Sequence, residues 1–176
     1  MNDSRLISTL NESRVARATA FPVSTVGGTF HALHRGHKEY LEIALAISDF
    51  VHVSVTSDRY AATLKSYEVQ PFDVRCKEIG SFLASVSAGE RFVLHKLDSE
   101  GELREFIFKT CLDVAVIEPR YLDLFQELNA LRRASDMNEY CILLKPRSRV
   151  GGVEVSSTTL QALWTEARAE SALRPR

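Results

Sequence analysis

The chain has 176 residues, 45% of them hydrophobic and 26% charged, which is typical of one globular domain with a full core. Its 22 basic and 23 acidic residues give a formal net charge of −1, so a general nucleic-acid-binding role, which needs a basic surface, is disfavoured. No apolar run is long enough to cross a membrane, and we expect no membrane partner.

The first 20 residues are polar and lack the apolar core of a signal peptide. They carry Arg5, Arg14 and Arg17 among serines and threonines, a composition that faintly resembles an organelle presequence. Asp3 and Glu12 argue against that interpretation, because such presequences are poor in acidic residues. We therefore expect residues 1–20 to form a flexible extension and residues 21–176 to form a single domain.

The first predicted strand is Val23–Val26, and it runs into two glycines, Gly27 and Gly28. Glycine lets the backbone approach a ligand closely, since it has no Cβ. His34 and His37 then stand at the entrance of a predicted helix, where unpaired N–H groups and the helix dipole favour anions. Imidazoles add further donors, so the segment predicts a phosphate-binding loop and nucleotidyl transfer. We expect no metal site, because the sequence offers no third ligand.

The rest of the chain alternates between helix and strand patterns. Helices are expected at Gly36–Ile47, Asp58–Leu64, Phe72–Val86, Leu103–Lys109 and Tyr121–Ala134. Further strands are expected at Phe50–Ser57, Phe92–Leu97, Val114–Ile117 and Cys141–Lys145. A basic loop follows at Pro146–Glu154, and Ser156 or Ser157 caps a last helix that runs toward Arg168. Apolar strands separated by helices predict an α/β fold with a doubly wound, mostly parallel five-stranded sheet.

Such sheets bind ligands at the carboxyl ends of their strands, near the switch in strand order. The glycine loop leaves the first predicted strand, Asp58 follows the second and Glu118 follows the fourth. Ser156 and Ser157 lie beyond the fifth. We therefore expect these segments to meet at one edge of the sheet.

Three strings of residues together resemble the HxGH nucleotidyltransferase superfamily. They are Gly27-Gly28-Thr29-Phe30, His34-Arg35-Gly36-His37 and, about 120 residues later, Val155-Ser156-Ser157-Thr158. Within the superfamily the chain is most similar to the archaeal and eukaryotic type of phosphopantetheine adenylyltransferase. That choice rests on shorter matches at Val53–Asp58, Lys65, Pro71, Arg75, Ser81–Leu83 and Asn129–Arg133.

The resemblance implies a Rossmann-like nucleotidyltransferase fold and a known reaction. A phosphate of the acceptor, 4′-phosphopantetheine, attacks the α-phosphorus of ATP in line, giving dephospho-coenzyme A and pyrophosphate. The partners it implies are ATP, with Mg²⁺ screening the triphosphate, and a small phosphorylated acceptor. Oligomeric state stays open.

The resemblance also implies roles for individual residues. His34, His37 and Lys65 are the expected catalytic residues. The expected nucleotide-binding residues are Gly27, Gly28, Thr29, Phe30, Gly36, Glu118, Ser156, Ser157 and Thr158. Thr29, Lys65 and Arg75 are expected to bind the acceptor, although Lys65 alone reads equally as a solvated lysine and Arg75 as a brace for its own helix.

The chain departs from the family pattern at two positions. His31 stands where the family often has an acidic residue, and Gln161 where it usually has arginine. Losing that cation removes a charge-assisted phosphate contact, which costs about 1.5–3 kcal/mol. Lys145, Arg147 and Arg149 are candidates to compensate. Two alternatives therefore stay open: a nucleotidyltransferase that uses CTP or another phosphorylated acceptor, and a nucleotide-binding regulatory protein without turnover.

Cysteine usage points to the redox compartment. Cys76, Cys111 and Cys141 form no Cys-x-x-Cys pair and lie among apolar residues, so we expect buried small hydrophobes and no disulfide framework. This pattern suits the reducing cytoplasm.

Overall fold

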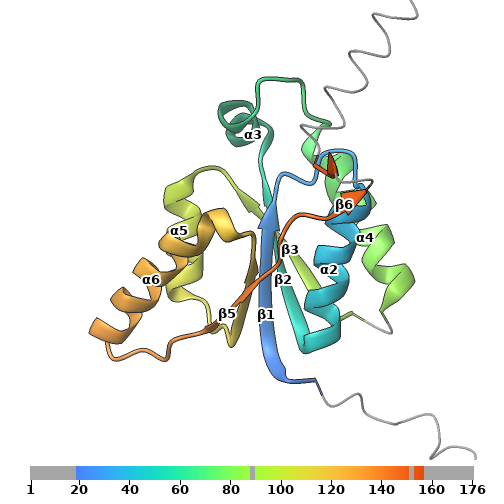
Figure 1. Ribbon diagram of the computed structural model, residues 1–176. Coiled ribbons are helices and arrows are strands. Elements are labelled where there is room, and N and C mark those ends of the chain that lie inside the picture. The colour runs from blue at the N-terminus through green and yellow to red at the C-terminus, as the bar shows by residue number, and fades with distance from the viewer. Residues whose placement is uncertain (1–18, 88–89, 151–152, 157–176) are drawn as a thin grey trace, which may run out of the picture.

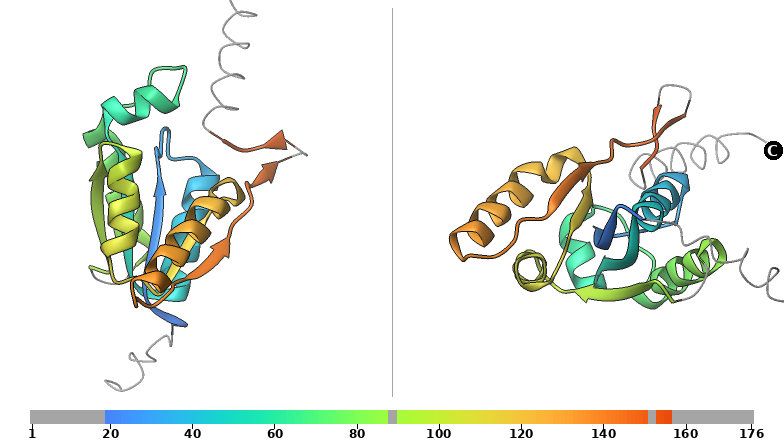
Figure 2. Two further views of the ribbon diagram at one scale, coloured as in Figure 1. Left: turned by 90° about the vertical axis from the view of Figure 1, so that its left-hand side faces the viewer. Right: turned by 90° about the horizontal axis from the view of Figure 1, so that it is seen from below.

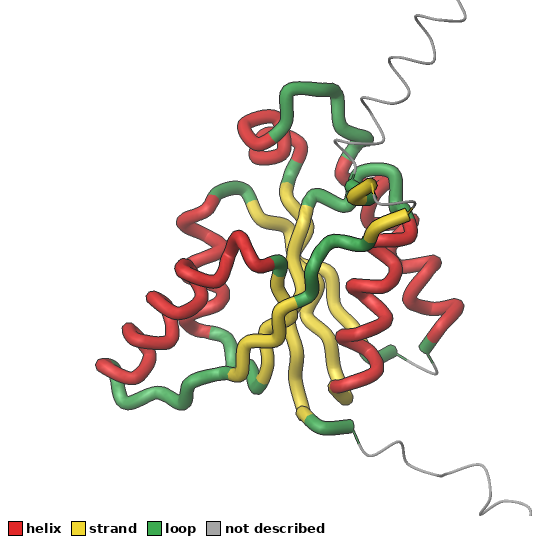
Figure 3. The backbone as a smooth tube through the Cα atoms, viewed as in Figure 1, coloured by secondary structure: helices red, strands yellow, loops and turns green. Residues whose placement is uncertain are grey.

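The computed structural model of the chain describes residues 19–87, 90–150 and 153–156. Figure 3 shows these residues as a central sheet flanked by helices. Most of the predicted extension at residues 1–20 lies outside the described residues, as do Ser157, Thr158 and the predicted last helix. None of the described helices is long and apolar enough to span a membrane.

The sheet has five strands in the order β3-β2-β1-β4-β5, and every pairing between neighbours is parallel (Figure 1). The strands are β1 (Phe21–Gly28), β2 (Ser48–Thr56), β3 (Phe92–Leu97), β4 (Val114–Ile117) and β5 (Cys141–Leu144). The prediction of a doubly wound, parallel five-stranded sheet is confirmed. From β1 the chain adds β2 and β3 on one side of the sheet, and it then returns to add β4 and β5 on the other side. The switch in strand order therefore lies between β1 and β4, beside the central strand.

Helices cover both faces of the sheet, as the two views of Figure 2 show. α2 (Arg35–Ile47) and α4 (Phe72–Val86) lie on one face, and α5 (Glu100–Lys109) and α6 (Leu122–Ala134) lie on the other (Figure 1). Successive residues of β4 alternate between the two layers: Val116 joins the core under α2 and α4, whereas Ala115 and Ile117 join the core under α5 and α6. A strand buried on both faces explains the uninterrupted apolar run that predicted it.

Most predicted elements agree with the structure to within two residues at each end, and two larger differences have local reasons. α5 begins at Glu100, one turn earlier than predicted, because Ser99 accepts a hydrogen bond from the Glu102 N–H at 3.1 Å. The Glu102 carboxylate in turn accepts one from the Asp98 N–H at 2.7 Å, so the turn is closed in both directions, much as in a capping box. The predicted loop Pro146–Glu154 contains an antiparallel pair, β6 (Arg149–Val150) and β7 (Val153–Glu154). Two residues per strand are too few to show a periodic pattern.

The short segments at the carboxyl edge also matter for the site. α3 (Asp58–Leu64) has the predicted bounds, and a 3₁₀ turn, η1 (Pro119–Tyr121), connects β4 to α6. The cysteines are free, as expected, but burial was predicted wrongly for two of them. Cys76 is half-buried, whereas Cys111 lies exposed between α5 and β4 and Cys141 lies exposed at the start of an edge strand.

A buried arginine holds the α5 and α6 layer together. Arg132 is 3% exposed, and its guanidinium donates to the carbonyls of Ile107, Phe108 and Thr110 at 2.7 to 3.3 Å. Its Nε also donates to the Asn138 carbonyl at 2.7 Å. The last carbonyls of a helix have no partner within the helix, so this side chain satisfies groups that burial would otherwise leave unpaired.

We expect Arg132→Met to lower the free energy of unfolding by about 2–4 kcal/mol, because the change leaves several buried carbonyls without hydrogen-bond donors. Arg133→Met is the matched control, since Arg133, the neighbour of Arg132, is exposed and pairs with Glu139 on the surface. That change should stay within about 0.5 kcal/mol. Urea titrations of both variants measure the difference, and equal losses would contradict a bracing role for Arg132.

Candidate active site

The site opens where two neighbouring strands separate. β1 and β4 pair only at Ser24 with Val114 and Thr25 with Ala115, although β1 runs on to Gly28. Beyond that point the carbonyl of Val116 accepts a hydrogen bond from the Tyr40 hydroxyl, which reaches it from α2. A side chain thus takes the place of the neighbouring strand, and the two strands stay apart at the carboxyl edge.

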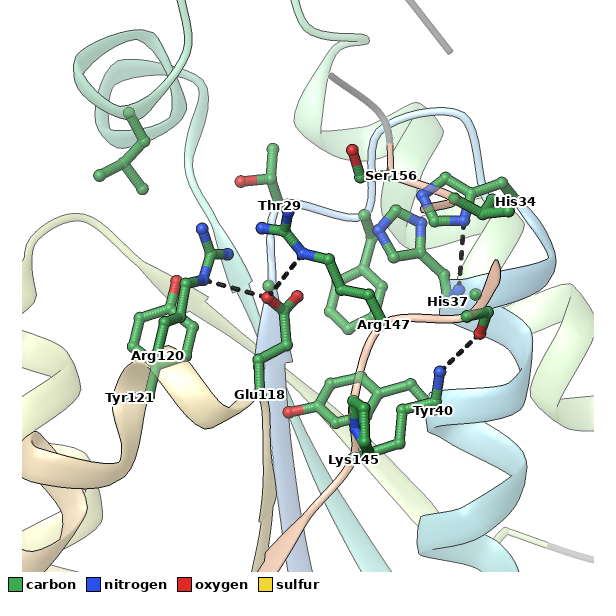
Figure 4. Close-up of a pocket in the computed structure, with 18 of the residues that line it drawn as sticks. Thr29, His34, His37, Tyr40, Glu118, Arg120, Tyr121, Lys145, Arg147 and Ser156 are labelled. Carbon is green, nitrogen blue, oxygen red and sulfur yellow. Dashed lines mark hydrogen bonds and ion pairs between the residues drawn. The ribbon is translucent and has the colours of Figure 1, made fainter. Parts of the chain in front are cut away.

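A polar cavity of about 200 Å³ occupies this opening (Figure 4). Ten of the predicted site residues line it: Gly27, Gly28, Thr29, Phe30, His34, Gly36, His37, Lys65, Glu118 and Ser156. The structure therefore brings together segments that follow β1, β2, β4 and β5, as expected from the parallel sheet. Ser157 and Thr158 lie outside the described residues, so their predicted roles stay predictions.

The two histidines are held against each other at the start of α2. His34 is the N-cap residue, and its Nδ1 accepts a hydrogen bond from the His37 N–H at 3.4 Å. The two histidine rings stack with their centroids 3.8 Å apart. The Phe30 ring packs against the His37 ring, with a distance of 5.2 Å between the centroids. Gly36 leaves little room for a side chain, because a Cβ there would meet the His34 ring at 3.1 Å and the Val155 carbonyl at 3.4 Å.

This packing fixes the protonation of both rings. Burial lowers the pKa of His34 to about 4 and holds the pKa of His37 well below its usual range, with nearby Lys145 adding to the shift of His34. Because His34 Nδ1 accepts a hydrogen bond, its Nε2 carries the proton of the neutral ring. That Nε2 atom is buried and has no hydrogen-bond partner among the described residues. The His34 Nε2–H is therefore a neutral donor that is available to an acceptor bound in the cavity.

The loop between β1 and α2 has a strained backbone. Phe30 and Ala32 have positive φ angles of 54° and 47°, a left-handed conformation that costs roughly 1–2 kcal/mol per non-glycine residue. Gln70 holds the loop from the segment before α4, because its side-chain carbonyl accepts from the Ala32 N–H at 2.6 Å. Its own backbone N–H donates to His31 Nδ1 at 3.1 Å. His31, one of the two departures from the family pattern, thus takes part in fixing the loop.

Arg75 does not face the cavity, contrary to the prediction that it binds the acceptor. Its side chain is 0% exposed. The guanidinium donates to the carbonyls of Thr29, Thr56 and Gln70 at 2.7 to 2.8 Å and to the Asp58 carboxylate at 2.8 Å. It thereby ties together the segments that follow β1, β2 and α3. Arg75 is a positioning residue, close to the bracing role that was the alternative.

Three cations that the motifs do not include also reach the polar cavity: Arg120 after β4, and Lys145 and Arg147 after β5. Lys145 and Arg147 were candidates for compensation, whereas Arg120 was missed. The sequence signal that could have identified Arg120 is its position just after the predicted parallel strand Val114–Ile117. Arg149, the third candidate, begins β6 and is not among the residues that line the cavity.

A second cavity, of about 300 Å³, lies on the α5 and α6 side of the same opening and is mainly apolar. It shares Gly27, Gly28, Tyr40, Thr56, Leu64 and Tyr121 with the polar cavity. Leu97, Ile107, Val116 and Phe125 supply apolar walls. Ser54 also lines it, and the Ser54 hydroxyl is buried with no hydrogen-bond partner among the described residues. One opening thus offers a polar and an apolar compartment side by side.

Known proteins share this sequence pattern. A family model described as cytidylyltransferase-like matches residues 25–163. A phosphopantetheine adenylyltransferase of Methanopyrus kandleri is 31% identical over 138 residues, covering 77% of this chain and 86% of that protein. Another, from Methanothermobacter thermautotrophicus, is 26% identical and covers 80% of this chain and 84% of that protein. The chain belongs to the cytidylyltransferase-like family.

The fold of this family member also matches a solved structure. A protein of unknown function from Archaeoglobus fulgidus superposes with a TM-score of 0.61 at 21% identity. The match covers 77% of this chain and 99% of that one. The likeness confirms the architecture, and the chemistry has to come from the site itself.

We expect the ligand-free protein to lose stability as pH falls from about 6.5 through about 4, with the His34 contribution fully present above pH 6.5. The folded state keeps His34 and His37 neutral, whereas the unfolded chain, with ordinary histidine pKa values near 6.5, takes up protons in that range. Thermal unfolding across this range should show a shallower pH dependence for the double variant His34→Gln/His37→Gln. His31, His52 and His95, whose pKa values burial also lowers, keep part of the slope. Identical slopes would contradict neutral histidines.

We expect Arg75→Lys to lower the free energy of unfolding by about 2–4 kcal/mol, because an ammonium cannot reach four separated acceptors. The strained loop loses its support, so the turnover number should also fall. Asp58→Asn is the matched control: it removes the charge from a partner that is 60% exposed, and its effect should be small. Unchanged stability together with a raised KM for the acceptor would instead restore the predicted substrate contact.

Proposed function

We propose that this protein is a nucleotidyltransferase that moves the adenylyl group of ATP to 4′-phosphopantetheine, giving dephospho-coenzyme A and pyrophosphate. The observation that carries the proposal is the pair of cavities that meet at Gly28 and Thr56. The polar cavity suits a triphosphate. The apolar cavity suits the uncharged arm of an acceptor whose phosphate lies at the junction, where Thr29 and Lys65 stand. The named relatives support the same substrate pair.

In this proposal an acceptor phosphate oxygen forms a new bond to the α-phosphorus of ATP. The bond from that phosphorus to the bridging oxygen of the β-phosphate breaks, and pyrophosphate leaves with the electron pair. Both reactants are anions, so the protein has to place them in line against their repulsion. His34 donates from a neutral ring, which strengthens a hydrogen bond as charge develops on the transferring group. Burial lowers the pKa of Lys65 beside this position, with Arg120 and Arg147 adding to the shift.

Mg²⁺ enters the proposal as an ion that arrives with the nucleotide. Among the described residues no group of three or more His, Cys, Asp or Glu side chains is placed to hold a metal. Glu118 is the one carboxylate among the described residues of the polar cavity. Mg²⁺ commonly binds phosphates with one or two carboxylates and keeps several waters, so this donor set fits. When bound, the ion supplies charge neutralisation on phosphate oxygens.

Two neighbouring functions have their own support. The matching family model is described as cytidylyltransferase-like, which favours CTP as the second candidate nucleotide. The departures at His31 and Gln161 favour a regulatory protein that binds nucleotide without turnover. The free thiols, two of them exposed, suit the cytoplasm as the compartment in which the enzyme works.

A pyrophosphate-release assay tests the proposal, with ATP or CTP, Mg²⁺ and several phosphorylated acceptors. We expect turnover with ATP and 4′-phosphopantetheine. Turnover only with CTP or another acceptor would transfer the assignment to the second candidate. Binding of ATP without turnover on any acceptor would favour the regulatory protein.

The apolar cavity gives the assay a sharper form. Ser54→Val should raise the KM for 4′-phosphopantetheine by about tenfold, since it removes an unpartnered hydroxyl and fills part of the cavity. The KM for ATP should change less than about twofold. Ser85→Val, at an exposed position of α4, is the matched control. Equal KM values for the acceptor in both variants would show that the arm binds elsewhere.

A further inference from the structure

We infer that Arg120, Lys145 and Arg147, which we name the cation wall, bind the triphosphate of the nucleotide together with the histidine loop. The inference rests on the proposed function and extends it to residues outside the HxGH and serine motifs. All three line the polar cavity together with Lys65 and Glu118. The wall comes from η1 and from the segment between β5 and β6.

The charge of the cavity is the first observation. With the histidines neutral, its described lining has four cations and one carboxylate, a local formal charge of +3. Counting Glu39, which pairs with Lys145 from outside the lining, leaves +2. The whole chain has a formal charge of −1. Cations concentrated in one cleft of a weakly acidic protein attract a polyanion and raise its local concentration. A triphosphate matches this excess better than the single phosphate of an acceptor does.

Glu118 orients two members of the wall. Figure 4 shows its carboxylate between Arg120 and Arg147, whose Nε atoms lie 3.1 and 3.2 Å from the same oxygen. The Arg120 guanidinium also lies 4.7 Å from the centre of the Tyr121 ring. Guanidinium groups bind carboxylate and phosphate oxygens with the same geometry. Glu118 therefore keeps two guanidinium groups side by side at the spacing of one anion, ready to exchange it for phosphate oxygens.

Glu39 holds the third member in a second network. Lys145 is 11% exposed, and its Nζ lies 2.7 Å from Ser148 Oγ and 3.4 Å from the Glu39 carboxylate. The Ser148 hydroxyl also donates to Glu39, and this bond, together with Arg35, lowers the pKa of Glu39 to about 2. The carboxylate belongs to α2, two residues after His37. The network thus fastens the segment that carries Lys145 and Arg147 to the helix that carries the histidines.

Further contacts join the segment that carries Lys145 and Arg147 to the histidine loop. The carbonyl of Ser148 accepts from the Val155 N–H at 2.7 Å, and the Val155 carbonyl lies against Gly36 in the histidine loop. A phosphate chain in the cavity therefore has neutral donors at the start of α2 and cations from η1 and the β5–β6 segment within the same lining. This mixed lining favours a polyphosphate, because several linked phosphates can contact more of these groups at once than a monophosphate can.

Inorganic tripolyphosphate is the probe, because it lacks the base, the ribose and any acceptor arm. We expect Arg147→Ala to weaken its binding by about tenfold, as for loss of a charge-assisted contact. Arg149→Ala is the matched control, since it removes the same charge from the same segment at an exposed position that does not line the cavity. Its Kd should stay within about twofold of the parent value, and the gap between the variants should shrink with added salt.

Glu118→Gln gives an independent arm. It removes the competing negative charge and should tighten tripolyphosphate binding, whereas weaker binding would overturn the exchange of carboxylate for phosphate.

Equal losses of tripolyphosphate affinity in Arg147→Ala and Arg149→Ala would overturn the cation wall, because only overall charge would matter. Thermal unfolding of each variant verifies that it folds. If Arg147→Ala leaves the Kd for tripolyphosphate unchanged while the parent protein releases pyrophosphate, the cation wall is overturned and the proposed function stands. If the parent protein neither binds tripolyphosphate nor turns over, the proposed function is overturned as well.

Discussion

The arrangement of the site depends on one buried guanidinium. Arg75 donates to carbonyls or a carboxylate on three separate segments, so the loops after β1, β2 and α3 share a single anchor. Burying that charge without partners would be costly, and the four acceptors offset the penalty. Arg75 binds the Thr29 carbonyl and the Gln70 carbonyl, and the Gln70 side chain binds Ala32. These contacts flank Phe30 and Ala32, whose left-handed backbone conformations neither residue favours by itself. The buried Arg75 contacts thus support the strained loop after β1 and fix where the histidine loop begins.

The same device recurs at two of the turns where a helix returns to the parallel sheet. Arg132 binds the last carbonyls of α5, and Arg91 donates to the carbonyls of Leu45, Ser48 and Asp49 where α2 turns into β2. A βα crossover leaves helix-end carbonyls close to the sheet, where water cannot always reach them. One arginine offers five donors in a fixed plane and satisfies several such carbonyls at once. The frame that carries the site is therefore built from guanidinium–carbonyl contacts as well as from apolar packing.

Much of this structure could be read from the sequence, and the limits have physical causes. Apolar runs such as Val114–Ile117 reveal strands because both of their faces are buried, and the carboxyl-edge rule placed Glu118 and His34 together. The two-residue strands at Arg149–Val150 and Val153–Glu154 carry no period, and Ser99 shifted the start of α5 through a local cap. The orientation of Arg75 was beyond reach for a different reason. An arginine beside a site binds either a ligand or the protein, and only the surrounding acceptors, set by three distant segments, decide which.

A division of labour between neutral and charged donors follows from the site as a whole. Fixed cations attract the triphosphate before and during the reaction alike, so their main effect is on binding. Neutral imidazoles attract a resting anion less, but their hydrogen bonds strengthen as charge grows on the transferring phosphoryl group. Burial keeps His34 and His37 neutral, and their rings stack with centroids 3.8 Å apart. The packing of the histidines thus has two effects: it keeps both rings neutral, and it leaves one nitrogen of each ring without a partner among the described residues, which our proposal assigns to the phosphates.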